Sequence, residues 1–250
     1  FFSETTKVPL GHFYENELPD KICKVPLDQF PNTKIDDKFN ITNSFVYFPE
    51  KLSLPPSNIQ LFVYNHIRDI SDTHLVFLDY PLGAVTIPLL GKGNRLINFT
   101  CRTFAARIAF QSNCSVVIGQ YATSGNCRIE GDNYLLTVGM DTMLSDGILI
   151  QTSDQHGILD VDTLSVINNS FSYVHIGRHV WVGRSSIVLK NTSIGDGSIV
   201  AAGALLTKSC DKFSIIGGSP NRIIKKNVSW SRNGAAPSNF ECRLINQIKK

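Results

Sequence analysis

Residues 175–208 read HIGRHVWVGRSSIVLKNTSIGDGSIVAAGALLTK, with an aliphatic residue at every sixth position from Ile176 onward. The aliphatic positions are Ile176, Val182, Val188, Ile194, Val200 and Leu206, and glycine follows three of them at Gly177, Gly183 and Gly195. A period of six matches neither the 3.6-residue period of an α-helix nor the two-residue alternation of a plain hairpin. It fits a chain that forms a short strand, turns a corner and repeats, so that three sides close a triangular coil. The stretch therefore predicts stacked parallel coils, and the alternative is an irregular sandwich with accidental spacing.

The aliphatic side chains of such coils are expected to point inward and to stack on neighbouring coils about 4.8 Å away. Each fully buried Ile, Val or Leu would contribute ~1.5–3 kcal/mol, so this stack is the expected stabilising element. Glycines are expected at the corners because glycine tolerates unusual backbone angles. A second register runs through Val138, Leu144 and Ile150, and the step from Val138 to Ile176 is six sixes plus two. Residues 153–174 are the expected place of the intervening irregular loop.

Three segments carry a resemblance to a known family: HIGRHVWVGRSSIVLK at 175–190, AAGALLTK at 201–208 and GGSPNRIIK at 217–225. They resemble the hexapeptide-repeat acyltransferases, which implies a left-handed parallel β-helix and acetyl-coenzyme A as the acyl donor. The sequence SDQH at 153–156, with Asp160, resembles the branch that acts on sugars of bacterial capsules and other surface polysaccharides. Within that branch the resemblance is greatest to polysialic acid O-acetyltransferases. It covers about residues 110–226.

The expected fold class is mainly β, in three parts. Residues 1–100 show no repeat, and their alternating apolar runs, such as Phe45-Val46-Tyr47, predict a small N-terminal β-rich cap. Residues 101–226 form the predicted β-helix acyltransferase domain, with an extruded loop near 153–174. Residues 227–250 form a C-terminal tail with a short terminal helix. The helical spacing of Phe240, Leu244, Ile245 and Ile248 predicts this helix, with Ser238 as its cap.

The composition is that of an ordinary folded chain. Of the 250 residues, 42% are hydrophobic and 18% are charged, which excludes disorder of the whole chain. Apolar runs stay far below the ~18 residues of a membrane span, so no span is predicted. The six cysteines form no C-x-x-C pair. Free thiols in a reducing compartment, and hence a cytoplasmic location, are therefore expected.

The net charge of +3 is too small to predict a nucleic-acid partner, but its distribution is uneven. Residues 203–250 carry a net +7, and residues 1–202 carry a net −4. One interpretation is a solvated basic end, and the other is a site for a phosphate-bearing ligand near that end. Composition alone leaves both open.

Acetyl transfer to a hydroxyl needs a base, and imidazole, which exchanges a proton near neutral pH, is the usual one. His156 is the candidate, because the resemblance places the catalytic histidine in this motif. Asp154, Asp160 or a backbone carbonyl could hold its ring, and the alternative is a loop histidine without a role. The other five are less favoured: His12, His66 and His74 are expected at packing or surface positions, and His175 and His179 at corners, with His179 possible in a cleft.

Trp181 precedes the inward Val182, so its indole is expected to point outward from the coil. A subunit contact is one interpretation. The resemblance implies that Trp181 lines the active site and orients the thioester or the acceptor. It also implies a homotrimer with active sites between subunits, which agrees with both interpretations. The sequence contains no Ser or Cys nucleophile motif, so direct transfer is expected, without an acyl-enzyme.

The expected coenzyme A site combines small and basic residues. Ala201, Ala202, Gly203 and Ala204 leave room for the pantetheine arm, and Lys208, Arg222, Lys225 and Lys226 supply charge for the phosphates. The ending Ser219-Pro220-Asn221-Arg222 departs from the family's more common Pro-Ala-Lys/Arg, which leaves the detailed contact at Asn221 open. A solvated basic tail is the alternative.

The predicted function is acetyl-coenzyme A-dependent O-acetylation of a bacterial surface glycan, in a capsule, a lipopolysaccharide or a sialic acid-containing polysaccharide. The alternatives are an N-acetyltransferase of an amino-sugar nucleotide, a zinc enzyme and a non-catalytic scaffold. A zinc site would have to use His156, His175 and His179, and no metal is predicted. A sugar nucleotidyltransferase is not favoured because residues 1–100 lack a glycine-rich nucleotide-binding loop.

Overall fold

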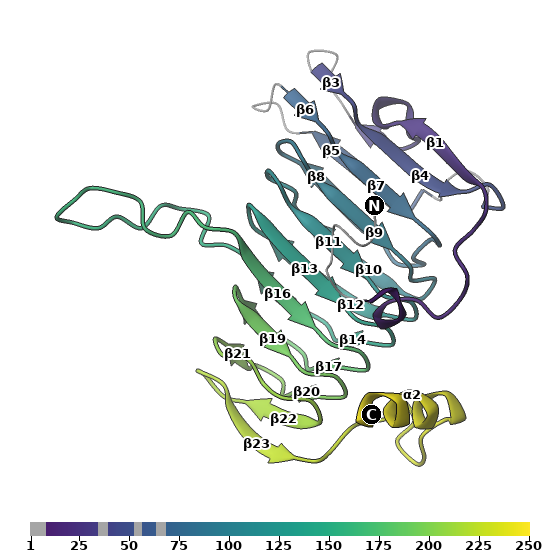
Figure 1. The fold of residues 1–250 in the computed structure, drawn as a ribbon, viewed down its shortest axis with the longest axis vertical. Helices are drawn as coiled ribbons and strands as arrows, with labels where there is room; N and C mark the ends of the chain where they lie inside the picture. The colour runs from purple at the N-terminus through teal and green to yellow at the C-terminus, as the bar shows by residue number, and fades with distance from the viewer. Residues whose placement is uncertain (1–8, 35–39, 53–56, 64–68) are drawn as a thin grey trace.

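The chain winds into a long three-sided coil of mostly parallel strands (Figure 1). The computed structural model describes residues 9–34, 40–52, 57–63 and 69–250. The first side of the coil is an eight-stranded sheet. Its strands, in spatial order, are β1 (Ile22–Pro26), β4 (Phe45–Pro49), β7 (His74–Phe77), β9 (Arg95–Asn98), β11 (Ser115–Ile118), β13 (Tyr134–Val138), β16 (Ser172–Ile176) and β19 (Thr192–Ile194). All pairs in it are parallel except β1 with β4, which is antiparallel.

A thirteen-stranded sheet bends around the other two sides of the coil. Its main path consists of β2 (Thr33–Lys34), β5 (Ile59–Val63), β8 (Val85–Leu89), β10 (Phe104–Ile108), β12 (Thr123–Glu130), β14 (Met143–Leu144), β17 (Trp181–Val182), β20 (Ile199–Val200), β22 (Ser214–Gly217) and β23 (Arg222–Lys226). The long strand β12 also pairs with a branch of three strands, β15 (Ile148–Gln151), β18 (Ile187–Leu189) and β21 (Leu205–Leu206). One turn of the coil thus runs β13, β14, β15.

Smaller elements close the two ends of the coil. Strands β3 (Asn40–Thr42) and β6 (Asp69–Ser71) form a separate parallel pair. Of two short 3-10 helices, η1 (Leu10–His12) precedes β1 in the sequence and η2 (Leu27–Gln29) follows it directly. The α-helix α2 (Asn239–Lys249) follows the last strand and packs beside the lower coils (Figure 1).

The predicted inward stack is confirmed. Val138 pairs with Ile176 and Ile176 pairs with Ile194, and the other two sides align their aliphatic residues in the same way. All nine aliphatic positions of the two registers are at most 1% exposed. The mainly β architecture that the sequence predicts, with parallel coils and a short C-terminal helix, is therefore the observed one.

A long arm, residues 152–171, interrupts the coil between β15 and β16 and explains the offset between the two registers. Val138 and its partner Ile176 are separated by a turn of the coil together with the arm, whereas Ile176 and its partner Ile194 are separated by three hexapeptides alone. The additional residues leave the coil at one corner and return to it, and Leu159 and Val166 form an antiparallel bridge within the excursion. Figure 1 shows this arm as the green extension that projects away from the stacked strands.

The structure differs from the expected boundary at residue 100. Strands on both sides of that position lie in the same two long sheets, so the described strands before residue 100 continue the coil and do not form a separate cap. Leu75 pairs with Leu96, Leu96 with Val116, and Val116 with Leu136. Each of these early turns is two or three positions longer than the turn from Ile176 to Ile194. Because an early turn exceeds three hexapeptides, its inward positions do not follow a period of six.

The glycines that follow the inward residues are explained by a different cause from the one expected. Gly139, Gly177, Gly183 and Gly195 do not have left-handed backbone angles. A side chain at Gly183 would place its Cβ 2.6 Å from the amide nitrogen of Ala202 in the next coil. The close approach of neighbouring coils therefore requires these glycines. Left-handed backbone occurs at Asp141, His179 and Gly197, each three residues after an inward position.

Helix α2 has the predicted cap and the predicted buried face. Glu241 N donates a 3.2 Å hydrogen bond to Ser238 Oγ, and the Glu241 carboxylate accepts from Ser238 N in return, which forms a capping box. Leu244 and Ile248 are buried against Met140, which anchors the helix to the coil. Within the described residues, no helix has both the length and the apolar character that crossing a membrane requires.

Candidate active site

His156 lies at the base of the arm, just after β15. Its side chain is exposed and lines a cavity of about 280 Å³ that also contains Asp132, Asp154 and Asn168. The Asn168 amide donates a 2.8 Å hydrogen bond to the carbonyl of His156, and its side-chain oxygen accepts one of 2.8 Å from the backbone of Ile158. Asn168 thus ties the two strands of the arm together at its base and holds the backbone that carries His156.

Asp154, expected beside His156, is held by other groups. Its Oδ2 accepts a hydrogen bond from Lys190 Nζ and one of 2.8 Å from Asn168 Nδ2. The bond from Lys190, followed by that from Asn168, lowers the pKa of the Asp154 carboxyl from its ordinary value. Lys190 follows β18 in the next coil, so the Asp154 carboxylate connects the arm's base to the coil.

Asp160, the second carboxylate considered for His156, belongs to the turn at the tip of the arm. It accepts hydrogen bonds of 2.8 and 2.9 Å from the backbone nitrogen and the hydroxyl of Thr163 and one of 3.1 Å from Asp162 N. The bond from the Thr163 backbone, with the hydroxyl bond, lowers the pKa of the Asp160 carboxyl. The structure therefore assigns Asp160 to the tip of the arm.

Trp181 lies on β17 and points outward, as the alternation along the strand predicts. Its side chain is 37% exposed, and the indole Nε1 donates a 3.1 Å hydrogen bond to Ser145 Oγ of the preceding coil. Trp181 forms one wall of a groove of about 350 Å³ whose other walls include Gly183, Arg184 and Ala202. This groove offers an aromatic face and small residues along one side of the coil.

His156 and Trp181 lie on different parts of a single chain. His156 follows β15 at the corner that leads into β16, whereas Trp181 lies on the side formed by β14, β17 and β20. The cavity of His156 and the groove of Trp181 have no lining residue in common. One copy of the chain therefore presents two separate pockets, one with His156 and one with Trp181.

The small and basic residues expected to contact the coenzyme lie on the same sheet as Trp181. Ala201 and Ala202 line the groove, and Gly203 follows with a left-handed φ of 71° at the corner. Strand β23, which carries Arg222, Lys225 and Lys226, is exposed along its whole length and is separated from β17 by β20 and β22. The structure thus brings the groove and the basic end together along one face.

Asn221, where the sequence departs from the family pattern, has a structural role. Its side-chain oxygen accepts hydrogen bonds of 2.9 Å from Thr207 N and 3.1 Å from Lys208 N, and its amide donates one of 2.9 Å to the carbonyl of Lys208. Asn221 therefore fixes the backbone beside Lys208. Arg222 follows directly at the start of β23.

The structure contains a buried group that the sequence interpretation missed. His179, expected at a corner, is fully buried: its Nδ1 lies 2.7 Å from Asp141 Oδ2, and its Nε2 donates to the carbonyl of Trp230 at 3.0 Å. The rings of His179 and Trp230 stack with centroids 4.6 Å apart, and the ring of Trp230 lies 6.1 Å from that of Trp181. The signal was available, since Asp141 and His179 both stand three residues after an inward aliphatic residue.

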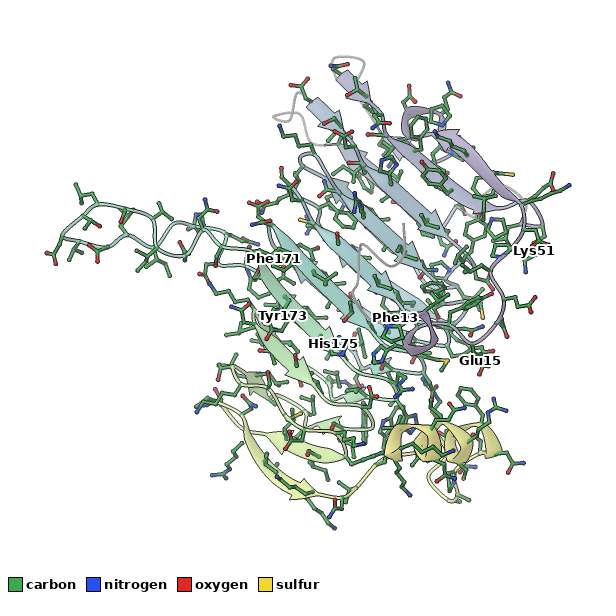
Figure 2. All side chains as sticks on the ribbon, viewed as in Figure 1. Phe13, Glu15, Lys51, Phe171, Tyr173 and His175 are labelled. Atoms are coloured by element: carbon green, nitrogen blue, oxygen red, sulfur yellow. The ribbon has the colours of Figure 1, made fainter. Side chains whose placement is uncertain are left out.

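The remaining histidines are spread through the fold. His12 and His175, the latter labelled in Figure 2, pack together with ring centroids 5.1 Å apart, and burial lowers the pKa of His12 to about 4. His74 lies on β7 beside Tyr47, and His66 falls outside the described residues.

The three histidines considered for zinc do not converge within one chain. Among the described residues, no group of three or more His, Cys, Asp or Glu side chains is placed to hold a metal ion.

Comparisons with known proteins agree with this architecture. Residues 173–208 match the family model of the bacterial transferase hexapeptide (six repeats). The polysialic acid O-acetyltransferase of Escherichia coli O1:K1 is 33% identical over 122 residues, which are 48% of this chain and only 39% of that protein. The polysialic acid O-acetyltransferase of Neisseria meningitidis is 25% identical over 221 residues, which are 86% of this chain and 95% of that protein.

Two solved structures have the same fold. The polySia-specific acetyltransferase NeuO has a TM-score of 0.66 and 22% identity, with 87% of this chain and 99% of that chain covered. The polysialic acid O-acetyltransferase OatWY has a TM-score of 0.52 and 23% identity, with 86% and 94% covered. The chain therefore has the parallel β-helix fold of these two structures, and residues 173–208 match the hexapeptide transferase model. The resemblance to polysialic acid O-acetyltransferases that the sequence motifs indicate is confirmed.

Proposed function

We propose that the chain transfers an acetyl group from acetyl-coenzyme A to a hydroxyl of a sialic acid-containing or related surface polysaccharide. The observation that carries the proposal is the pair of half-sites on one β-helix: His156 at the base of the arm, and Trp181 above a groove that continues toward a basic strand. The names of the two polysialic acid O-acetyltransferases support a glycan acceptor.

The proposed donor site follows the groove away from Trp181. The pantetheine arm lies along Ala201 and Ala202 of the groove and continues past Gly203, because methyl groups and glycine leave the backbone accessible. Lys208, Arg222 and Lys225 then face the phosphates, because exposed ammonium and guanidinium groups form charge-assisted hydrogen bonds with phosphate oxygens. Trp181, between the donor groove and the acceptor, orients the thioester.

The proposed chemistry is a direct transfer. The His156 imidazole takes the proton of the acceptor hydroxyl while that oxygen attacks the thioester carbonyl. The carbon–sulfur bond then breaks, the acetyl group stays on the sugar oxygen, and the coenzyme A thiolate takes the proton back from the imidazolium. Asp154 contributes as a positioning residue, because its bonds to Asn168 and Lys190 hold the segment that carries His156.

The proposed active form is a homotrimer in which His156 of one protomer faces the Trp181 groove of the next. The separation of the two half-sites in one chain supports this assembly. So does the arm: seven of its apolar side chains are between 50 and 84% exposed, which is unusual for a surface without a partner. They are Ile158, Leu159, Val161, Leu164, Val166, Ile167 and Phe171. A neighbouring protomer would cover them.

The proposed location is the cytoplasm, where acetyl-coenzyme A is available. The described residues contain free cysteines at all six positions, as expected in a reducing compartment.

The variant His156→Ala tests the function most simply. We expect its acetylation of polysialic acid by acetyl-coenzyme A to fall by roughly 10²–10⁴-fold, because the general base is lost. Coenzyme A binding and the mass of the assembly should not change. The matched control is His74→Ala, which removes a histidine on β7, far along the coil from the arm, and should retain activity. Turnover at the wild-type rate by His156→Ala would contradict the assignment of the base. If the wild-type protein acetylated the amine of an amino-sugar nucleotide and not polysialic acid, the proposed acceptor would be wrong.

A further inference from the structure

A third cavity, of about 550 Å³, opens where the C-terminal tail crosses the coil. It lies at the corner between β13 and β14 and beside helix α2. Figure 1 shows that helix on the opposite side of the coil from the arm. Its lining comes from the coil and from the tail, and the residues that matter are Arg102, Tyr121, Thr123, Arg232, Phe240 and Glu241. The volume falls within the range of roughly 300–1,000 Å³ that small-molecule sites occupy.

This cavity and the proposed donor groove lie on opposite sides of Trp181 along one sheet. Thr123 pairs with Met143, and Met143 pairs with Trp181, so Thr123 is two strand spacings of about 4.8 Å from the indole. In the other direction Trp181 pairs with Ile199, which lines the donor groove. Because the proposed donor occupies the groove at Ile199, the side of Trp181 that faces Thr123 is left for the acceptor.

Side chains of the tail connect the cavity to Trp181. The ring of Trp230 lies 6.1 Å from that of Trp181, and the guanidinium of Arg232 lies 5.3 Å from the Trp230 ring. Arg232 Nη1 in turn donates a 3.1 Å hydrogen bond to Thr123 Oγ1 at the cavity. The wall from the indole to the cavity is therefore continuous.

The charges in the cavity suit an anionic sugar. Both of its carboxylates are already paired: Asp141 accepts from His179 and Arg232, and Glu241 accepts from Arg232 N, Ser231 and Ser238. The Arg232 guanidinium thus offsets the charge of Asp141, and the oxygens of the charged Glu241 are occupied by donors of the tail. The exposed guanidinium of Arg102, in contrast, lies 5.5 Å over the ring of Tyr121 and faces the solvent in the cavity. The planar guanidinium group can donate two parallel N–H hydrogen bonds to the two oxygens of one carboxylate.

The aromatic lining suits the apolar face of a sugar ring. Tyr121 and Phe240 meet edge to face with centroids 5.5 Å apart, and both side chains are only half-buried. Aromatic rings beside a few fixed polar groups are the usual composition of a small-molecule site.

We infer that this cavity binds the units of an anionic polysaccharide acceptor that neighbour the unit being acetylated, with a sugar carboxylate on Arg102 and a sugar ring against Tyr121 and Phe240. The inference rests on the proposed function, to which it adds a second point of contact for a polymer. It predicts that the chain prefers a polymer to a single sugar because a polymer occupies the reacting site and this cavity together.

Binding of polysialic acid without acetyl-coenzyme A tests the inference separately from catalysis. The dissociation constant of polysialic acid should rise about tenfold in Arg102→Ala, because a charge-assisted hydrogen bond is lost. Arg102→Lys should recover part of the affinity, since it keeps the charge but not the planar fork. Arg128→Ala is the matched control: it removes an exposed positive charge at the other end of β12, and it should bind as the wild type does.

Acetylation kinetics measured in parallel separate this inference from the proposed function. The KM for polysialic acid should rise about tenfold in Arg102→Ala, with kcat unchanged and with the KM for single sialic acid unchanged. Equal affinity of the wild type and Arg102→Ala for the polymer, or no binding of the polymer to the wild type, would overturn the inference. If either result were found and the wild type still acetylated single sialic acid, the proposed function would remain. If the wild type acetylated no acceptor at all, the proposed function would be wrong.

Discussion

At the scale of single residues, the Trp181 indole packs beside a buried group formed by Trp230 and His179. Trp230, which is 8% exposed, packs beside the indole and stacks on His179. The two residues also exchange hydrogen bonds, since Trp230 Nε1 donates 2.8 Å to the carbonyl of His179 and His179 Nε2 donates to the carbonyl of Trp230. Since Nδ1 lies 2.7 Å from Asp141 Oδ2, both ring nitrogens of His179 have a hydrogen-bond partner, and the ring is fixed in place.

Replacement of Trp230 should therefore impair catalysis through Trp181. Trp230→Phe keeps an aromatic ring on His179 but loses the Nε1 donor, and we expect kcat/KM to fall about tenfold, the effect of losing about 1.4 kcal/mol of transition-state stabilisation. Trp230→Ala should also cost about 3–5 kcal/mol of unfolding free energy, because it empties a buried aromatic site. Steady-state kinetics and denaturant unfolding measure the two effects.

A matched control separates positioning from loss of stability. Phe30 is 2% exposed and stacks with Phe77 in the early coils, which lie far from Trp181 along the axis of the coil. Phe30→Leu should lower stability while kcat/KM stays at the wild-type value. The single variant Trp181→Phe is measured beside Trp230→Phe. If Trp181→Phe has a lowered kcat/KM and Trp230→Phe has the wild-type value, Trp230 does not position the indole.

At the scale of elements, the arm is held at its base by the Lys190–Asp154–Asn168 bonds and at its tip by the Asp160 turn. The offset of two in the repeat register predicted that a loop had to intervene, and it does so between β15 and β16. Its internal pairing was not predictable, because the bridge between Leu159 and Val166 joins residues in a segment without alternation. The partners of Asp154 were hidden for a similar reason, since Lys190 lies far from it in sequence, beyond the whole arm.

A double-mutant cycle tests the role of Asp154 at the base of the arm. Asp154→Asn and Lys190→Ala should each lower kcat/KM by less than His156→Ala does, because they loosen the segment that carries the base and leave the base present. The double variant should lose no more than the larger single effect, since the two residues act through one bond. Asp162→Asn, at the tip, is the control. Additive losses would indicate that Asp154 acts directly on the His156 ring.

Helix α2 gives a prediction about pH. Although burial opposes its ionisation, backbone hydrogen bonds from Arg232 and Ser238 lower the pKa of the Glu241 carboxyl from 4.5 to about 2. A lowered carboxyl pKa stabilises the fold above pH 4.5, and this stabilisation is lost as the pH falls toward 2. Glu241→Gln should therefore cost at most about 3 kcal/mol of unfolding free energy at pH 7. The difference from the wild type should shrink as the pH approaches 2, which urea unfolding at several pH values measures; a difference independent of pH would contradict it.

At the scale of the whole molecule, one continuous coil carries the His156 cavity and the Trp181 groove at two separate places. The later coils were predictable because each turn consists of three hexapeptides and places Ile176, Val182 and Val188 on successive sides. The earlier coils were not, because their longer turns hide the same inward stack at Leu75, Leu96 and Val116 from a search for period six.

The candidate site, like the coil, could be predicted from the sequence only in part. His156 and Trp181 could be named from the motif and from the alternation along a strand. Their separation in one chain, and the wall that Trp230 and Arg232 add, depend on contacts across long stretches of sequence. The tail's contribution had no local pattern to reveal it, because residues 229–236 lie outside any repeat.

We place the active site between protomers, and mixed trimers of two inactive variants test this placement. His156→Ala and Trp181→Ala should each be inactive alone, and a trimer assembled from equal amounts of both should recover about a quarter of the wild-type sites, those in which an intact His156 faces an intact Trp181 across an interface. Acetylation of polysialic acid by the co-refolded mixture measures the recovery. A mixture that remains as inactive as its separate components would contradict the claim.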